Sequence, residues 1–247
     1  MIHLGTWQDA AWPEQVDCII TDPPYSERTH SGNNGGRREK RDPSRDPAKK
    51  CPSGSKPIRQ IDYTSLTETD VQAWAKAWAP RVRYWIAVMC DHSLIPTWSA
   101  ALSAAGLYTF APVPCVITGM TCRLTGDGPS SWAVYLMVAR SKAASKWGTL
   151  PGAYVVPHED SGRAENRIGG KPLPLMRQIV RDYSRPGMVV ADPCCGYGTT
   201  LIAAAEQGRT VWGCDTDAES VRRTRERLET VKAQPQLFEA ATQLEIT

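Results

Sequence analysis

A carboxylate, two prolines and a tyrosine follow a strand-like apolar run, residues 18–21, near the start of the chain. Asp22 and the Pro23 carbonyl are hydrogen-bond acceptors. Pro24 fixes its backbone φ angle and Tyr25 presents a flat aromatic face. Two acceptors that hold both protons of a ring-bound amine would localise the nitrogen lone pair, which could then attack an electrophile. The alternative is a plain strand end at which Asp22 caps the next segment.

A glycine-rich turn follows a second strand-like run, residues 188–191, near the other end of the chain. This turn reads Asp192-Pro193-Cys194-Cys195-Gly196-Tyr197-Gly198-Thr199-Thr200. Its glycines allow a tight turn and a close approach of the backbone to a ligand. A helix is predicted from Thr199, and the next strand, 210–214, leads to Asp215, where a carboxylate can bind a ribose diol. Together these features indicate a nucleotide-type cofactor site, although Asp215 could instead cap the following helix.

With both turns present, the chain resembles the S-adenosylmethionine-dependent DNA amino-methyltransferases, the DNA methylase N-4/N-6 family. The order is the permuted one of the β-class, in which the Asp-Pro-Pro-Tyr element comes first and the cofactor loop last. The resemblance covers the two ends of the chain well and the middle poorly. It implies direct transfer of the cofactor methyl group to a base amine, without a covalent enzyme intermediate. The catalytic residues that it implies are Asp22, Pro23, Pro24 and Tyr25.

The resemblance also implies which residues hold S-adenosylmethionine. A short strand over 2–6 is predicted, and Thr6 stands where the family usually has an aspartate that reaches the cofactor's adenine; a plain turn residue is the alternative. Cys194 stands where the family usually has phenylalanine, and Lys171-Pro172 resembles the element before the cofactor strand. The implied cofactor-binding residues are Thr6, Lys171, Asp192, Pro193, Cys194, Gly196, Gly198, Thr199, Thr200 and Asp215.

The target of such an enzyme is double-stranded DNA, from which the base must be flipped out of the stack onto Tyr25. Family usage of Asp-Pro-Pro-Tyr favours the N6 amine of adenine over the N4 amine of cytosine, and the residues themselves favour neither. RNA is a weaker alternative. A catalytically silent nucleic-acid-binding module of the same fold is a further alternative, favoured by Thr6 and Cys194. Methylation of a protein glutamine would prefer asparagine at position 22 and a cofactor loop ahead of it, so this activity is not expected.

The two polar turns can meet only if neighbouring strands of one sheet carry Asp22 and Asp192 at their carboxyl ends. The sequence therefore predicts an α/β fold with a Rossmann-like, doubly wound, mostly parallel sheet covered by helices on both faces. The resemblance adds an antiparallel closing strand and a circularly permuted strand order. A chain of 247 residues can bury the core of one domain, so a single methyltransferase domain, 1–247, is expected.

Hydrophobic patterns predict the remaining elements. Strands are expected over 16–21, 84–90, 108–118 and 131–139. Helices are expected from Thr67 to Pro80, over 94–105 with Gly106 as terminator, and from Lys171 to Arg185. The apolar stripes of the first and last of these helices are interpreted as core. No clear pattern is found beyond Lys232.

Residues 26–62 are interpreted as a flexible basic insertion loop, because they are rich in Gly, Ser, Asn, Pro, Lys and Arg and contain little that can be buried. The loop leaves directly from the candidate active site, so its basic side chains could contact phosphates; an inert insertion is the alternative. The residues predicted to bind nucleic acid are Arg28, Arg37, Arg38, Lys40 and Arg41. A second segment, 141–170, occupies the place of the family's target-recognition region and is short for that role.

Composition adds broad limits. A net charge of +3 neither demands nor excludes a polyanionic partner. The eight cysteines show no Cys-x-x-Cys pair and read as reduced thiols, so no metal site is expected. Neither a signal peptide nor an apolar run of membrane-spanning length is recognised, which favours a cytoplasmic protein without a membrane partner. A homodimer is allowed by the sequence, and the resemblance implies a setting of restriction and modification.

Overall fold

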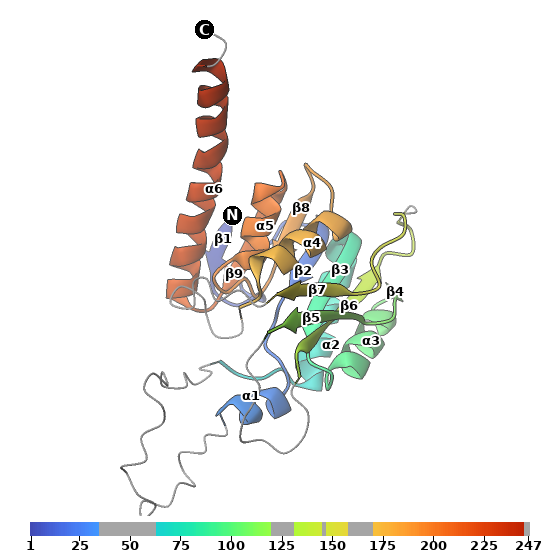
Figure 1. Cartoon of the computed structure of the whole chain (residues 1–247). Coiled ribbons are helices and arrows are strands. Elements are labelled where there is room, and N and C mark those ends of the chain that lie inside the picture. The colour runs from blue at the N-terminus through green and yellow to red at the C-terminus, as the bar shows by residue number, and fades with distance from the viewer. Residues whose placement is uncertain (35–62, 120–130, 145–146, 158–169, 245–247) are drawn as a thin grey trace, which may run out of the picture.

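The computed structural model describes residues 1–34, 63–119, 131–144, 147–157 and 170–244 (Figure 1). A single sheet runs through them in the order β1-β9-β8-β2-β3-β6-β5-β7, with β4 paired to β6. Its strands are β1 (Ile2–Leu4), β2 (Val16–Thr21), β3 (Val82–Cys90), β4 (Tyr108–Thr109), β5 (Val113–Thr118), β6 (Ala133–Arg140), β7 (Tyr154–Pro157), β8 (Val189–Asp192) and β9 (Thr210–Asp215). The helices are α1 (Glu27–Asn34), α2 (Glu68–Trp78), the 3-10 turn η1 (Ala79–Arg81), α3 (Ile95–Ala104), α4 (Leu173–Tyr183), α5 (Thr199–Glu206) and α6 (Ala218–Leu244).

The sheet is parallel from β1 through β9, β8 and β2 to β3. Strand β6 then runs antiparallel to β3, and β5 runs antiparallel to β6. Strand β7 adds a parallel edge to β5. The mostly parallel α/β sheet with an antiparallel closing strand, predicted from the sequence and the resemblance, is confirmed.

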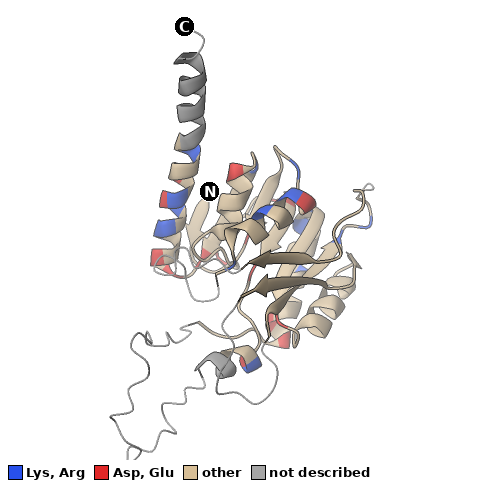
Figure 2. Ribbon diagram, in the orientation of Figure 1, with Lys and Arg blue, Asp and Glu red and all other residues tan. Residues whose placement is uncertain are grey.

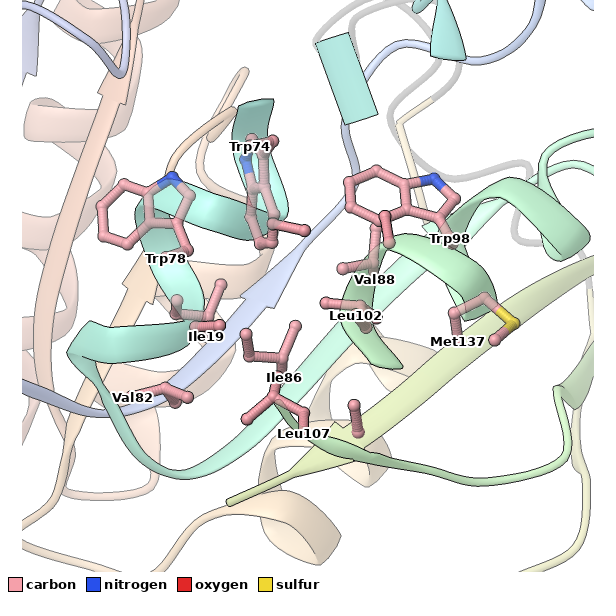
Figure 3. Packing of buried hydrophobic residues seen from close by; sticks show 14 of the residues in the cluster. Ile19, Trp74, Trp78, Val82, Ile86, Val88, Trp98, Leu102, Leu107 and Met137 are labelled. Carbon is pink, nitrogen blue, oxygen red and sulfur yellow. The ribbon is translucent and has the colours of Figure 1, made fainter. Parts of the chain in front are cut away.

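Apolar side chains bury the central strands on both faces, as the strands of parallel sheets require. On one face, Ile19 of β2 and Ile86 of β3 pack against the tryptophans of α2 and α3 (Figure 3). On the other face, Cys18 and Ile20 of β2 pack with the apolar side of α4. Figure 1 shows the resulting layers, with α2 and α3 on one side of the sheet and α4 and α5 on the other.

Both helices whose apolar stripes are interpreted as core pack as expected. In α2 the buried residues are Val71, Trp74, Ala75 and Trp78, and in α4 they are Leu175, Met176, Ile179, Val180 and Tyr183. Helix α2 begins in a capping box: the Thr67 side chain accepts from the Asp70 backbone, and the Asp70 side chain accepts from the Thr67 backbone.

The structure differs from the local predictions at four places. The strand predicted over 108–118 is split into β4 and β5, with Pro112, which has no N–H for the ladder, between them. Residues 154–157 of the predicted target-recognition segment form the edge strand β7. The predicted insertion loop begins with a helix, α1, and residues 35–62 with Arg37, Arg38, Lys40 and Arg41 lie outside the described residues.

The fourth difference is α6, which continues past Lys232 to Leu244. Its first turns pack on α5 through Val221 and Leu228, close to Ile2 of β1. In the part of the chain that the structure describes, no helix combines the length and the apolar character of a membrane span.

The contact between α5 and α6 predicts a strict requirement for glycine at position 198. Gly198 has φ +76°, and a Cβ atom there would lie 2.5 Å from Thr224 Cγ2 of α6. Gly187 has a similar φ of +82° but open space around it, so Gly187→Ala is the matched control. We expect Gly198→Ala to lower the free energy of unfolding by roughly 2–4 kcal/mol, clearly more than the control, because it adds overpacking to backbone strain.

Urea denaturation of the two variants measures this difference. The double variant Gly198→Ala/Thr224→Ala should lose less stability than the sum of its single changes, because the clash is removed. Equal losses for Gly198→Ala and Gly187→Ala would contradict the proposed clash.

Candidate active site

The carboxyl ends of β2 and β8 bring the two polar turns together. The strands pair in parallel, with Cys18 opposite Val190 and Ile19 opposite Ala191. At the end of the pair, the Thr21 hydroxyl donates a hydrogen bond of 2.6 Å to Asp192 Oδ1. Asp22 and Asp192 therefore lie at the neighbouring strand ends that the sequence requires.

A single cavity of about 410 Å³ lies along these strand ends. This volume is within the range of small-molecule and cofactor pockets. The predicted residues that line it are Thr6, Asp22, Pro23, Pro24, Tyr25, Lys171, Asp192, Pro193, Cys194, Gly196, Thr199, Thr200 and Asp215. Gly198 is the one predicted cofactor residue outside the lining, and it caps the start of α5.

Both carboxylate oxygens of Asp22 accept a hydrogen bond. The Tyr25 hydroxyl donates to Oδ1 over 2.9 Å, and the Lys171 ammonium donates to Oδ2 over 2.6 Å. The Lys171 nitrogen also lies 4.9 Å from the centroid of the Tyr25 ring. Burial, and then the charge of Asp22, raises the pKa of Tyr25 well above its ordinary value. The phenol therefore stays protonated and keeps its role as donor.

Asp192 is buried with uncharged donors. Its side chain accepts from the Thr21 hydroxyl and, over 3.1 Å, from the Cys194 backbone N–H. Burial raises the pKa of Asp192 to about 7, although these hydrogen bonds act in the opposite direction. A cationic ligand beside this carboxylate would supply the charge that its present donors lack.

Asp215, at the end of β9, ties the glycine-rich turn to the sheet. It accepts from the Gly196 N–H over 2.8 Å and from the Asp217 N–H over 2.9 Å. The start of α6 is capped by Asp217, which accepts from the Ser220 N–H over 3.0 Å. Asp217 therefore caps that helix, whereas Asp215 lines the cavity.

Thr6 lines the cavity and begins a turn. Its hydroxyl donates to Asp9 Oδ2 over 2.5 Å, and the Ala10 N–H bonds to its carbonyl over 3.1 Å. A hydroxyl oxygen has two lone pairs, so Thr6 can still accept a hydrogen bond from a ligand. The local pattern gave no sign of Asp9, whose carboxylate orients this hydroxyl.

The thiols beside the cavity are protonated at neutral pH. Burial raises the pKa of Cys194 and of Cys195 well above the ordinary value, and raises that of Cys214 to about 12. Protonated thiols are poor nucleophiles. Within the described ranges, the His, Cys, Asp and Glu side chains form no group that could hold a metal ion.

Asp91, to which the sequence assigned no role, positions the segment after Tyr25. Its carboxylate accepts from the Ser26 N–H and hydroxyl, from the Thr29 hydroxyl, and from the N–H groups of Ser93 and Leu94. Burial alone would raise the pKa of Asp91, but the hydrogen bonds from Ser26 and Thr29 outweigh it and the pKa is lowered. These bonds hold α1 at the end of β3, and they explain a helix that composition did not predict.

Aromatic side chains complete the Asp22 side of the cavity. His30 of α1 is buried and meets the Tyr63 ring edge to face, with 5.2 Å between ring centroids. Both line the cavity, as do Thr29 and Leu66, and the Leu66 N–H donates to the Tyr25 carbonyl over 3.1 Å. Sequence patterns miss these residues because the insertion separates the two segments.

Of the residues predicted to contact nucleic acid, Arg28 is the one that the structure describes. It is exposed on α1, next in sequence to the cavity-lining Thr29. Figure 2 shows both basic and acidic positions on the described part of α1.

Known proteins resemble this chain in part of its sequence and in its fold. A family model described as DNA methylase matches residues 128–226. The type II methyltransferase M1.MboII of Moraxella bovis is 33% identical over 93 residues, which are 32% of this chain and 36% of that protein. The chain thus matches only about a third of the length of this curated relative.

Solved structures show the same fold. The M1.HpyAVI complex with SAM has a TM-score of 0.63 and 18% identity, over 92% of this chain and 98% of that one. The cytosine-N4-specific PvuII DNA methyltransferase has a TM-score of 0.64 and 12% identity, over 94% of this chain and 89% of that one.

Burial of Asp192 makes a prediction about stability and pH. Its pKa in the folded protein, about 7, is above that of an unfolded aspartate, so the carboxylate costs stability as pH rises from 4 to 7. Asn keeps an oxygen for the Thr21 hydroxyl and carries no charge. We expect Asp192→Asn to raise the free energy of unfolding by roughly 1–3 kcal/mol at pH 8, and by less as pH falls toward 4.

Urea denaturation at several pH values measures this effect. Asp70→Asn is the matched control of opposite sign, because hydrogen bonds from Thr67 lower the pKa of Asp70. A variant at Asp192 that is less stable than the wild type at pH 8 would show that the buried charge costs nothing.

Proposed function

We propose that this chain is an S-adenosylmethionine-dependent DNA methyltransferase that modifies a base amine, because a family model described as DNA methylase matches residues 128–226. One observation carries this proposal. The Thr21–Asp192 hydrogen bond of 2.6 Å joins the strand that ends at the Asp-Pro-Pro-Tyr turn to the strand that ends at the glycine-rich turn, and both turns line one cavity. Fold likeness and the family match support it.

The residues around the glycine-rich turn fit S-adenosylmethionine. Asp192 is a buried carboxylate that accepts from the uncharged Thr21 hydroxyl and Cys194 N–H, and it suits the cofactor's ammonium. Asp215 suits the ribose hydroxyls, and the first N–H groups of α5 suit the carboxylate. When bound, the cofactor supplies an electrophilic methyl group on a positively charged sulfur.

The Asp22 corner fits the target amine. Asp22 and the Pro23 carbonyl accept the two N–H bonds of the amine, which localises the nitrogen lone pair. Asp22 also receives the proton that the amine loses. Protonated thiols at Cys194 and Cys195 agree with direct transfer that needs no covalent intermediate. Positioning and electrostatics then supply most of the rate enhancement.

The substrate we propose is double-stranded DNA with the target base flipped into the cavity. An amine inside the duplex cannot reach Asp22, which lies at a strand end within the cavity. The rings of Tyr25, His30 and Tyr63 form an aromatic wall against which a base can stack. Arg28, exposed beside this wall, can contact a phosphate. We also propose a role in DNA modification within a restriction–modification system, as the type II relative suggests.

We propose adenine N6 as the preferred target because of the Asp-Pro-Pro-Tyr motif. Cytosine N4 is the second candidate, since the PvuII enzyme with the same fold is cytosine-N4-specific. Asp22 and the Pro23 carbonyl would accept either amine equally well. The recognition of the remaining ring edge decides between the two bases.

The decisive experiment incubates the protein with methyl-labelled S-adenosylmethionine and DNA, digests the DNA to nucleosides, and identifies the labelled nucleoside. We expect label in N6-methyldeoxyadenosine. Label in N4-methyldeoxycytidine would establish the second candidate. DNA without label, under conditions where calorimetry shows cofactor binding, would favour the catalytically silent module.

The variant Asp22→Ala should transfer methyl groups at least about 100-fold more slowly, because the amine loses its principal acceptor. Cofactor binding, measured by calorimetry, should persist. Glu229→Gln, which changes an exposed carboxylate on α6, is the control and should transfer like the wild type. Wild-type turnover in Asp22→Ala would remove Asp22 from the proposed role.

A further inference from the structure

Lys171 occupies the place that the proposed function reserves for the target amine. Its ammonium nitrogen lies 2.6 Å from Asp22 Oδ2, the acceptor assigned to the amine. The same nitrogen lies 4.9 Å from the centroid of Tyr25, the ring assigned to the base. One cationic nitrogen therefore holds both of the contacts that a flipped base would use.

This ion pair is shielded from solvent. The Lys171 side chain is 8% exposed and that of Asp22 is 22% exposed. A shielded, charge-assisted hydrogen bond is stronger than one from a neutral donor. The neutral amine of a base therefore competes poorly for Asp22 Oδ2 while the ammonium remains there.

The chemistry of the transfer adds a second reason for Lys171 to leave. The amine nitrogen gains positive charge as it is methylated, and it sheds this charge by losing a proton toward Asp22. A second positive charge on the same carboxylate would oppose both changes by Coulomb repulsion. Transfer therefore requires that the ammonium has moved away from Asp22.

The position of Lys171 in the chain allows this movement. The residue lies just before α4, and its neighbour Gly170 is exposed and lines the same cavity. A flexible four-carbon stem can thus carry the ammonium from the cavity toward solvent without a change in the helix.

We propose, on the basis of the proposed function, that Lys171 is a positioning residue that stands in for the target amine. In the free protein it holds Asp22 in place and keeps other donors from that carboxylate. It withdraws when the base enters. This role differs from the cofactor contact that the family resemblance implies for Lys171, and it sets the cost of base entry.

Chemical labelling of the full chain, without DNA or cofactor, tests the resting position. An amine-acylating reagent in limiting amount is applied to the wild type and to Asp22→Asn, and each lysine is quantified by peptide mass spectrometry. Lys232, which is 69% exposed, is the internal reference. We expect slow labelling of Lys171 in the wild type and a several-fold increase in Asp22→Asn, with Lys232 unchanged. Equal labelling of Lys171 in both proteins would overturn the proposal.

Kinetics with a DNA that the wild type methylates tests the withdrawal. Lys171→Met keeps the length of the side chain without its charge, and Lys171→Arg keeps the charge. We expect a several-fold lower KM for DNA in Lys171→Met, because no ammonium has to be displaced, and no such decrease in Lys171→Arg. Thermal melts check that both variants fold.

Cofactor affinity separates the two roles of Lys171. By calorimetry, Lys171→Met should bind S-adenosylmethionine at least as tightly as the wild type. Weaker binding, or an unchanged KM for DNA, would overturn the proposal and return Lys171 to the cofactor site. If the wild type methylates no DNA, the proposed function fails, whereas the labelling result still shows whether Lys171 rests on Asp22.

Discussion

The parallel pairing of β2 with β8 is the constraint on which the site depends. The strands are far apart in sequence, and the hydrogen bond between Thr21 and Asp192 spans 171 positions. Each strand is buried on both faces, so a register shift of one residue would move its apolar side chains into different packing environments. Correct packing of the sheet therefore also fixes the distance between the Asp-Pro-Pro-Tyr turn and the glycine-rich turn.

Three carboxylates in one cavity are kept distinct by their partners. Asp22 accepts a hydrogen bond from the ammonium of Lys171, and Asp192 accepts from a hydroxyl and a backbone N–H group. Asp215 accepts from two backbone N–H groups. Burial raises the pKa of Asp192 to about 7, and no cation is among the partners named here for this carboxylate. The cavity thus offers one buried carboxylate ready for a cation, one occupied by an internal cation, and one that fixes the backbone of the turn.

A rigid core supports the site from both faces of the sheet. The tryptophans of α2 and α3 pack against the centre of β2 and β3 (Figure 3), so the strand that leads to Asp22 has little freedom to move. Asp91, at the end of β3, then anchors Ser26 and Thr29, directly after the Asp-Pro-Pro-Tyr motif. The aromatic wall of the cavity is held by this anchor rather than by the strand itself.

Residue patterns alone determined much of this protein. The parallel sheet was predicted from the apolar runs that end at Asp22 and Asp192, from the glycine-rich turn and from the apolar stripes of the helices. These patterns involve residues that are close together in sequence, so they can be recognised without the structure. Only the tertiary structure decided that Lys171 binds Asp22 and that Asp91 anchors α1 through Thr29. It also decided that residues 154–157 join the sheet and that His30 contacts Tyr63 in the cavity. The physical reason is that these features are contacts between side chains or strands distant in sequence, and their strength depends on burial that no local pattern reports.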